Sequence, residues 1–294
     1  MPSAPLLDRE FLEKLERLTI HWQKSFAGLV GGHNMSRFAG AGQEFLDHRN
    51  FHHGDDLRAV NWRAYLRLEK LFLKMFQVEP RVPVRLLLDL SDSMLAHGGQ
   101  KLDYARKLAA VLCYVGLVRH DSIEIHGFTN RLTQRVFSTG GRHRISAVME
   151  GISQLEARGR TDYLAMVREF ITAYSQRGLV VILSDFLDDV GCERALQYLV
   201  DFGHELMLLQ VWADEDRTPP WTGELELHDA ETGEGLKLDF DEGARQRYTR
   251  AFDEYSSSIQ AVALRSGGRY AGIATSQSLE SVVFGDLIKA RGIA

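Results

Sequence analysis

The chain has 294 residues, of which 45% are hydrophobic and 26% charged, an ordinary composition for a soluble globular protein. Its net charge of −5 argues against nucleic acid held by a broadly basic surface. Two cysteines, Cys113 and Cys192, support neither a disulfide framework nor a zinc site, and Cys113 is expected in the core.

The sequence also carries expectations about location. Residues 1–10 lack the apolar stretch of a signal peptide, and no run of about 18 apolar residues could form a membrane span. We therefore expect a cytoplasmic protein without membrane insertion.

Residues 1–81 are expected to form an N-terminal helix-and-strand segment packed on a main domain at 82–294. Apolar residues recur at helical spacing over 8–30, which predicts one amphipathic helix. A glycine-rich polar stretch at 31–42 follows as an ordered loop, and alternation at 71–78 predicts a strand.

From residue 84 the pattern alternates between strands and helices. Strands are expected at 84–89, 123–128, 132–137, 179–184, 205–212 and 268–273. Helices are expected at 101–119, 143–155, 162–176, 192–201, 242–265 and 278–289. This alternation predicts an α/β fold with an open, mostly parallel sheet and helices on both faces. Residues 214–240 interrupt it and predict an inserted hairpin.

The most informative stretch is the end of the first of these strands, where an apolar run leads into Asp89-x-Ser91-x-Ser93. Thr161 precedes a predicted helix, and Asp185 follows the strongest apolar strand. Ligands of open parallel sheets bind outside the carboxyl ends of the strands, so we expect these five side chains to converge there. Their hard oxygens favour Mg²⁺, with Mn²⁺ or Ca²⁺ as alternatives, and leave a coordination position for water or a partner's carboxylate.

The neighbouring polar residues are given structural interpretations. Asp162 is expected to cap a helix, whereas Asp92, Asp188 and Asp189 are expected to be solvated loop carboxylates. A phosphatase of the haloacid-dehalogenase type needs a second carboxylate two residues after its strand-end Asp, and here that residue is Ser91. No nucleophile elbow, phosphate loop or zinc-protease helix is present.

The motifs resemble known families. Asp-x-Ser-x-Ser followed by Thr and Asp, on this α/β pattern, resembles the metal-ion-dependent adhesion site of von Willebrand factor A domains. The stretches Gly40-x-Gly42-x-Glu44-Phe45-x-x-x-Arg49, Gly54-Asp55-Asp56-x-Arg58-x-x-Asn61-Trp62, Ser184-Asp185-Phe186, His204-Glu205 and Asp229-x-Glu231-Thr232-Gly233 are similar to the signature of the bacterial family called domain of unknown function 58. Asn61 and Phe51-His52-His53 depart from that signature.

The resemblance implies a von Willebrand factor A-like fold and a non-enzymatic, metal-dependent protein-interaction module. Its implied partner is a MoxR-type AAA+ ATPase, or a client protein that the pair assembles or activates, bound through an acidic side chain. Two alternatives stay open: a metal-dependent phosphoester hydrolase, which lacks an evident general base, and a metal-free scaffold.

Upstream, Asp55 and Asp56 lie among Arg58, Arg63 and Arg67 beside Trp62. The cluster is either a structural corner or a partner-binding surface. If Trp62 anchors a buried corner, its truncation to alanine should destabilise the protein by about 3–5 kcal/mol.

Overall fold

The computed structural model describes residues 6–18, 20, 45–53, 55–76, 83–118, 122–138, 141–187, 191–231 and 233–293. The chain divides into two compact units, a main unit of Met1–Lys24 with Val82–Ala294 and a small unit of Ser25–Arg81. The N-terminal residues therefore belong to the main unit, and the expected packing of the small unit on it stays a prediction. The glycine-rich stretch at 31–42 lies outside the described residues.

The main unit is built on a six-stranded sheet with the order β10-β7-β6-β3-β4-β5. Its strands are β3 (Val84–Asp89), β4 (Ile123–Phe128), β5 (Leu132–Ser138), β6 (Leu179–Ser184), β7 (Glu205–Trp212) and β10 (Arg269–Ala274). All neighbouring strands are parallel except β5, which runs antiparallel to β4 at one edge. The central strands are buried throughout because helices cover both faces.

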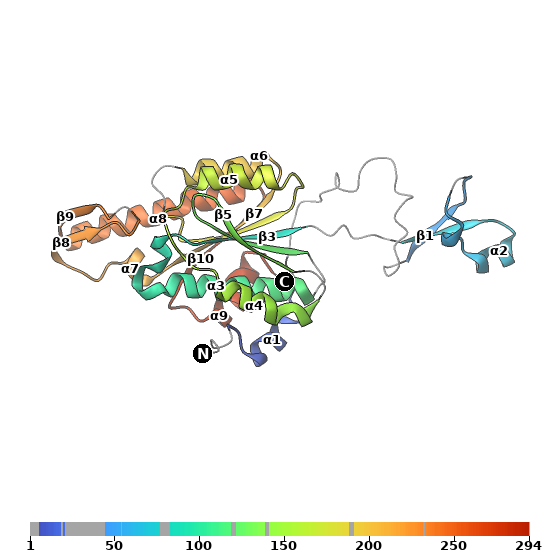
Figure 1. The fold of residues 1–294 in the computed structure, drawn as a ribbon, viewed down its shortest axis with the longest axis horizontal. Helices are drawn as coiled ribbons and strands as arrows, with labels where there is room; N and C mark the ends of the chain where they lie inside the picture. The colour runs from blue at the N-terminus through green and yellow to red at the C-terminus, as the bar shows by residue number, and fades with distance from the viewer. Residues whose placement is uncertain are drawn as a thin grey trace. The chain divides into compact units, whose positions relative to one another are not determined.

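Two groups of helices sandwich the sheet (Figure 1). One face carries α1 (Arg9–Leu15), α3 (Gln100–Val118), α4 (Ile145–Ser153) and α9 (Leu279–Ser281), which continues into a π-helical turn (Val282–Leu287). The other carries α5 (Tyr163–Ala173), α6 (Cys192–Asp201) and α8 (Glu242–Arg265). Each face of the sheet packs against its helices in a separate hydrophobic core, and alternate residues of β3 belong to the two cores. Leu86 and Leu88 lie in the core with α3, whereas Leu87 lies in the core with Phe170 of α5. The predicted mixed α/β architecture with a mostly parallel sheet is confirmed.

Shorter elements complete the main unit. A 3₁₀ segment (Asp92–Gly99) and a 3₁₀ turn (Arg142–Arg144) precede α3 and α4, and α7 (Asp214–Arg217) follows β7. The inserted hairpin is present as β8 (Gly223–His228) and β9 (Gly235–Phe240). Within the described residues, no helix has the length and apolar character to cross a membrane. Cys113 is fully buried in α3, as expected.

The expectation of one helix over 8–30 is wrong. Helix α1 ends at Leu15, after which the backbone N–H of Leu18 donates to the Leu15 carbonyl at 3.0 Å and reverses the chain. Ile20 then forms an isolated antiparallel bridge with Ile293. Leu15, Leu18 and Ile20 are all buried, so apolar spacing here marks contacts made by a helix and by the irregular chain after it.

The small unit pairs β1 (Phe45–Asn50) antiparallel with β2 (Phe72–Phe76), and a 3₁₀ turn (Leu57–Ala59) and α2 (Trp62–Leu68) lie between them. Asp55 pairs through both carboxylate oxygens with Arg49, at 2.7 and 2.9 Å, rather than with the arginines that follow it. Trp62 is 54% exposed and meets Tyr65 edge to face. The interpretation of Trp62 as a buried anchor is therefore wrong within this unit.

Candidate metal-binding edge of the sheet

The candidate site is centred on Asp89, the last residue of β3, which is 1% exposed. Its Oδ1 accepts hydrogen bonds from the backbone N–H of Ser91 at 2.9 Å and from Thr161 Oγ1 at 3.1 Å. Its Oδ2 accepts from Ser184 Oγ at 2.6 Å and from the Tyr163 hydroxyl at 3.2 Å. Three segments far apart in sequence thus meet on one buried carboxylate.

The turn after β3 holds the two serines of the motif. The hydroxyl oxygens of Ser91 and Ser93 are 2.9 Å apart and share a hydrogen bond. Asp92 between them donates its N–H to the Gly159 carbonyl at 2.8 Å and accepts the Gly159 N–H on Oδ1 at 3.0 Å. Asp92 is therefore half-buried and ties this turn to the Thr161 loop, and its interpretation as a solvated carboxylate is wrong.

Thr161 owes its position to the start of α5. Asp162 caps that helix by accepting the N–H of Ala165 at 2.9 Å, as predicted. Thr161 directly precedes Asp162, so the capped start of α5 fixes where its backbone lies. The Thr161 hydroxyl consequently reaches Asp89.

Asp185 follows β6 and is 2% exposed. Its Oδ1 accepts the N–H of Leu187 at 3.2 Å, and its Oδ2 accepts from Lys101 Nζ at 2.8 Å. The next residue, Phe186, is buried in the left-handed region at φ 57°, which is costly for a bulky side chain. The hydroxyl of Tyr255 donates to the Phe186 carbonyl at 2.7 Å and helps hold this turn. Asp188 and Asp189 lie outside the described residues.

Lys101 was not found by sequence reasoning, although its ammonium group is buried at this edge. Lys101 belongs to α3, and its side chain is only 1% exposed. Its Nζ also lies 3.2 Å from Oδ2 of Asp216. The other oxygen of Asp216 meets His97 Nε2 at 2.9 Å. Burial lowers the pKa of Lys101, but the attraction of Asp185 and Asp216 outweighs burial and raises it. Lys101 is therefore a permanent counterion of Asp185.

Glu231 is a second charged side chain near this edge whose position could not be deduced from the sequence. It lies between β8 and β9, and its Oε2 accepts the backbone N–H of Thr161 at 3.3 Å. Burial raises the pKa of Glu231 to about 7; the Thr161 hydrogen bond opposes this, and the charges of Asp89 and Asp185 add to it. In the sequence, Glu231 was marked only by the stretch Asp229-x-Glu231, which is similar to the family signature. Nothing in that stretch indicated where the carboxylate would lie in the fold.

Burial has the largest effect on the carboxyl group of Asp89, and the negative charge of Asp185 adds to it. Burial, followed by the charge of Asp185, raises the pKa of Asp89 to about 6, while hydrogen bonds from Ser184 and Ser91 oppose the rise. A cation placed between these carboxylates would relieve both the desolvation and the repulsion.

We use the name Asp89 edge for the candidate site at the carboxyl ends of β3 and β6. It consists of the five predicted side chains: Asp89, Ser91, Ser93, Thr161 and Asp185. Carboxylate and hydroxyl oxygens suit a hard divalent cation, and the repulsion felt by Asp89 fits a site that a cation completes. Across the described ranges, no three His, Cys, Asp or Glu side chains are grouped to hold a metal ion, so the hydroxyl groups are essential to this donor set.

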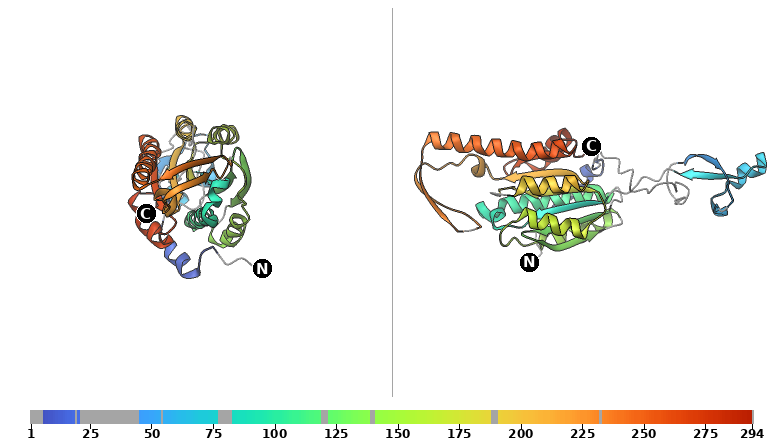
Figure 2. Two further views of the ribbon diagram at one scale, coloured as in Figure 1. Left: turned by 90° about the vertical axis from the view of Figure 1, so that its left-hand side faces the viewer. Right: turned by 90° about the horizontal axis from the view of Figure 1, so that it is seen from above.

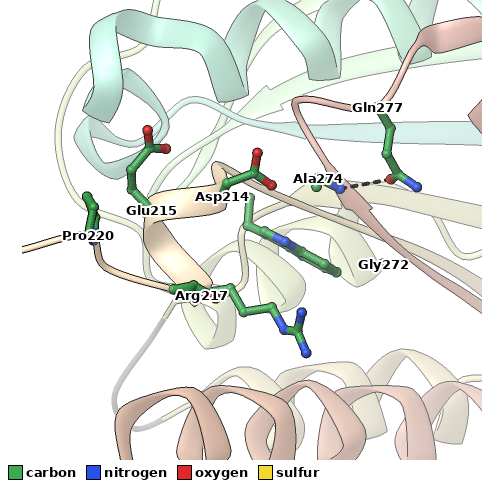
Figure 3. A pocket seen from close by; sticks show the side chains of 9 residues that line it. Asp214, Glu215, Arg217, Pro220, Gly272, Ala274 and Gln277 are labelled. Atoms are coloured by element: carbon green, nitrogen blue, oxygen red, sulfur yellow. Dashed lines mark hydrogen bonds between the residues drawn. The ribbon is translucent and has the colours of Figure 1, made fainter. Parts of the chain in front are cut away.

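A separate hollow lies beside the edge, around α7 and the ends of β7 and β10 (Figure 3). Figure 3 shows the carboxylates of Asp214 and Glu215 on one side of α7 and Arg217 pointing away on the other. Arg217 is neutralised by Asp253, with Nε 2.8 Å from its Oδ1. The hollow includes none of the five predicted residues, so it does not coincide with the Asp89 edge.

The comparisons with known proteins name a family but no activity. A family model described as Protein of unknown function DUF58 matches residues 47–257, well over half of the chain. An uncharacterized protein of Mycobacterium bovis is 23% identical over 249 residues, covering 83% of this chain and 78% of its own length. An uncharacterized protein of Mycobacterium tuberculosis strain H37Rv matches with the same values.

Solved structures with a similar course of chain were also found. The conserved hypothetical protein BatB from Bacteroides thetaiotaomicron is 19% identical with a TM-score of 0.43, over 71% of this chain and 98% of that one. The pilus adhesin SpaC from Lactobacillus rhamnosus GG is 12% identical with a TM-score of 0.44, over 74% and 31%. With TM-scores below 0.5, neither likeness carries an argument about this chain.

Proposed function

This chain belongs to the family Protein of unknown function DUF58, and we propose that it is a non-enzymatic, metal-dependent protein-interaction module with a von Willebrand factor A-like fold. One observation carries the proposal: Thr161 Oγ1 lies 3.1 Å from Oδ1 of Asp89, and the Ser91 turn meets the same oxygen. A hydroxyl group from one loop and a backbone N–H from another thereby meet on one buried carboxylate, and the charge of Asp185 acts on the same carboxylate.

The metal in this proposal is Mg²⁺, with Mn²⁺ or Ca²⁺ as substitutes. Asp89, Ser91, Ser93, Thr161 and Asp185 would hold it. Bound there, the cation would supply a positive centre that accepts a carboxylate oxygen from another molecule. Lys101 already neutralises Asp185, and it would limit the negative charge that the protein itself offers.

The proposed partner is a MoxR-type AAA+ ATPase, or a client that the pair assembles or activates. This assignment rests on the family resemblance, and the chemistry asked of the partner is an exposed acidic side chain. A cytoplasmic location fits such a partner and is part of the same proposal.

The test measures binding of a MoxR-type ATPase from the same host at constant Mg²⁺, because a chelator would also disturb the nucleotide site of the ATPase. Asp89→Asn is the informative variant, because Asp89→Ala would leave the Ser184 and Tyr163 hydroxyls without their acceptor. Asp103→Asn, an exposed change on α3, is the control. We expect Asp89→Asn to weaken binding at least about tenfold, because even the loss of a residue that only supports a metal ligand costs about 10–100-fold. Equal binding by all three proteins would contradict the proposal.

A hydrolase remains the second candidate because the fold brings a carboxylate that could act as a general base close to the Asp89 edge, and no such base was evident from the sequence. The carboxylate of Glu231 stands beside the Asp89 edge with a pKa raised to about 7, chiefly by burial, where a general base works best. The discriminating measurement is turnover of a generic phosphoester with Mn²⁺. Turnover abolished by Glu231→Gln would favour the enzyme, and no turnover would favour the interaction module.

The metal-free scaffold is favoured by a different observation. All four donors around Asp89 come from the protein, so its carboxylate is satisfied without a cation. Titration with Mg²⁺ separates this candidate from the first.

A further inference from the structure

The small unit leaves several large apolar side chains outside its own core. Val60 and Leu73 are joined by an antiparallel bridge and are only 4% and 5% exposed. On α2, by contrast, Trp62 is 54% exposed and Leu66 is 81% exposed. The exposed large apolar residues of this stretch are Leu57, Trp62, Tyr65, Leu66 and Leu68. Such a concentration of exposed apolar side chains is typical of an interaction surface.

Helix α2 is anchored at its start and presents one apolar side. The side chain of Asn61 caps the helix, and its backbone N–H donates to the Phe72 carbonyl at 2.7 Å. Figures 1 and 2 show α2 at the end of the strand pair where β1 finishes and β2 begins. Trp62, Tyr65 and Leu66 are spaced at i, i+3 and i+4, so they share one side of the helix. The rings of Trp62 and Tyr65 meet there with centroids 6.1 Å apart.

The same stretch carries uncompensated positive charge. Its exposed cations are Arg58, Arg63, Arg67 and Lys70. Arg49 of the same unit is neutralised by Asp55, whereas none of these four cations forms an ion pair within the part of the chain that the structure describes. The acidic residues of this stretch are Asp56 and Glu69, so four cations against two carboxylates leave +2 on residues 56–70 of a chain with net charge −5. A negatively charged surface is therefore the complementary partner.

The geometry fits an anionic lipid surface better than a groove in a protein. A helix that fits a groove places anchors at i, i+3, i+4 and i+7. Here the fourth position is Glu69, a charged residue in the left-handed region at φ 52°, where α2 ends. Leu57 and Leu68 extend the apolar surface beyond this spacing. Leucine is uncommon among protein hot spots, whereas tryptophan and leucine flanked by arginine and lysine are typical of helices that lie on membranes.

We propose that this surface attaches the protein peripherally to a membrane that contains anionic lipids. We use the name α2 face for the five exposed apolar residues and the four cations together. The rings of Trp62 and Tyr65 lie at the level of the headgroups, Leu66 reaches the acyl boundary, and Arg63 and Arg67 meet the lipid phosphates. This attachment needs neither a spanning helix nor a metal ion.

The test is sedimentation of the full chain with vesicles of equal parts phosphatidylglycerol and phosphatidylethanolamine. Vesicles of phosphatidylcholine are the uncharged control. Leu66→Gln should weaken binding about tenfold, because a buried leucine side chain is lost. Arg63→Gln should weaken it about fivefold, the contribution of one cation near an anionic surface. Glutamine keeps a helix propensity close to that of both residues.

Matched controls change the same residue types outside the α2 face. Leu236→Gln replaces a leucine that is 62% exposed in β9, and Arg194→Gln removes an exposed cation of α6. Both should bind the anionic vesicles within about twofold of the wild type. Asp89→Asn should also bind as the wild type does, because Asp89 belongs to the other compact unit. A failure of the metal site would therefore leave this result unchanged.

Binding to the anionic vesicles alone, weakened by rising salt and by the α2 variants, would support the proposal. A wild-type chain that stays in solution with these vesicles would overturn it. Equal binding by Leu66→Gln and the wild type would overturn it too, as would a loss in the controls as large as that in the α2 variants. Sedimentation without vesicles would show that the protein self-associates, and would also overturn it.

Discussion

Replacing Lys101 by methionine should destabilise the main unit strongly. The ammonium group lies 2.8 Å from Asp185 and 3.2 Å from Asp216, and these side chains are 1%, 2% and 10% exposed. Methionine keeps the length of the side chain but leaves two carboxylates without their counterion. Removing one partner of a buried ion network costs about 3–5 kcal/mol. We expect the lower end, about 3 kcal/mol, because Asp216 keeps its contact with His97 and Asp185 keeps the Leu187 N–H.

The assay is urea unfolding followed by circular dichroism, with Lys107→Met as a control on the exposed side of α3. The control should change the free energy of unfolding by less than about 0.5 kcal/mol. Asp216→Asn in the Lys101→Met background should restore part of the loss, since it removes one unpaired charge. A loss below about 1 kcal/mol in Lys101→Met would refute the buried counterion.

The remaining predictions concern pH, exposure and packing. Without divalent cations, the free energy of unfolding should fall as pH rises from about 4 to about 7, because folded Asp89, with its pKa raised from 3.8 to about 6, retains a proton that the unfolded chain releases. The full shift is worth about 3 kcal/mol, of which about 1.4 kcal/mol is lost between pH 5 and pH 7.5. Urea unfolding of wild type and Asp89→Asn at these two pH values isolates the share of this group, and parallel profiles would contradict the raised pKa. Trp62→Ala should cost less than about 1 kcal/mol in thermal unfolding, and a larger loss would mean that the exposed ring is covered elsewhere in the protein. Phe170→Ala, in the fully buried core of α5, should cost about 3–5 kcal/mol by the same measurement, and a loss similar to that of Trp62→Ala would count against the described core.

Much of the main unit could be predicted because its elements are specified locally. The strands β3, β4, β6 and β7 match the expected ranges residue for residue. For β6 and β7 the reason is that helices on both faces require nearly continuous apolar runs. Helix α8 also matches, with Asp241 as its cap. The failure at 8–30 has the opposite cause, because Ile20 is buried by a bridge to Ile293 and not by helical periodicity.

The site could be predicted only where topology alone fixes proximity. Asp89 ends β3 and Asp185 directly follows the neighbouring strand β6, so strand order places them at one edge. Thr161 reaches the same edge through the start of α5. Lys101 and Glu231 could not be found this way. A lysine near the start of a helix ordinarily lies in solvent, and only the packing of α3 against β6 and β7 reveals its burial. A glutamate in a hairpin turn gives no local sign of the loop that it meets.

The most direct test of the central claim is calorimetric titration of Mg²⁺ into the wild type and into Asp89→Asn, with Asp103→Asn as the surface control. We expect one Mg²⁺ per chain in the wild type and in the control, and none in Asp89→Asn, with the circular dichroism spectrum unchanged in all three. Absence of binding in the wild type, or equal binding in Asp89→Asn, would contradict a metal site at the Asp89 edge.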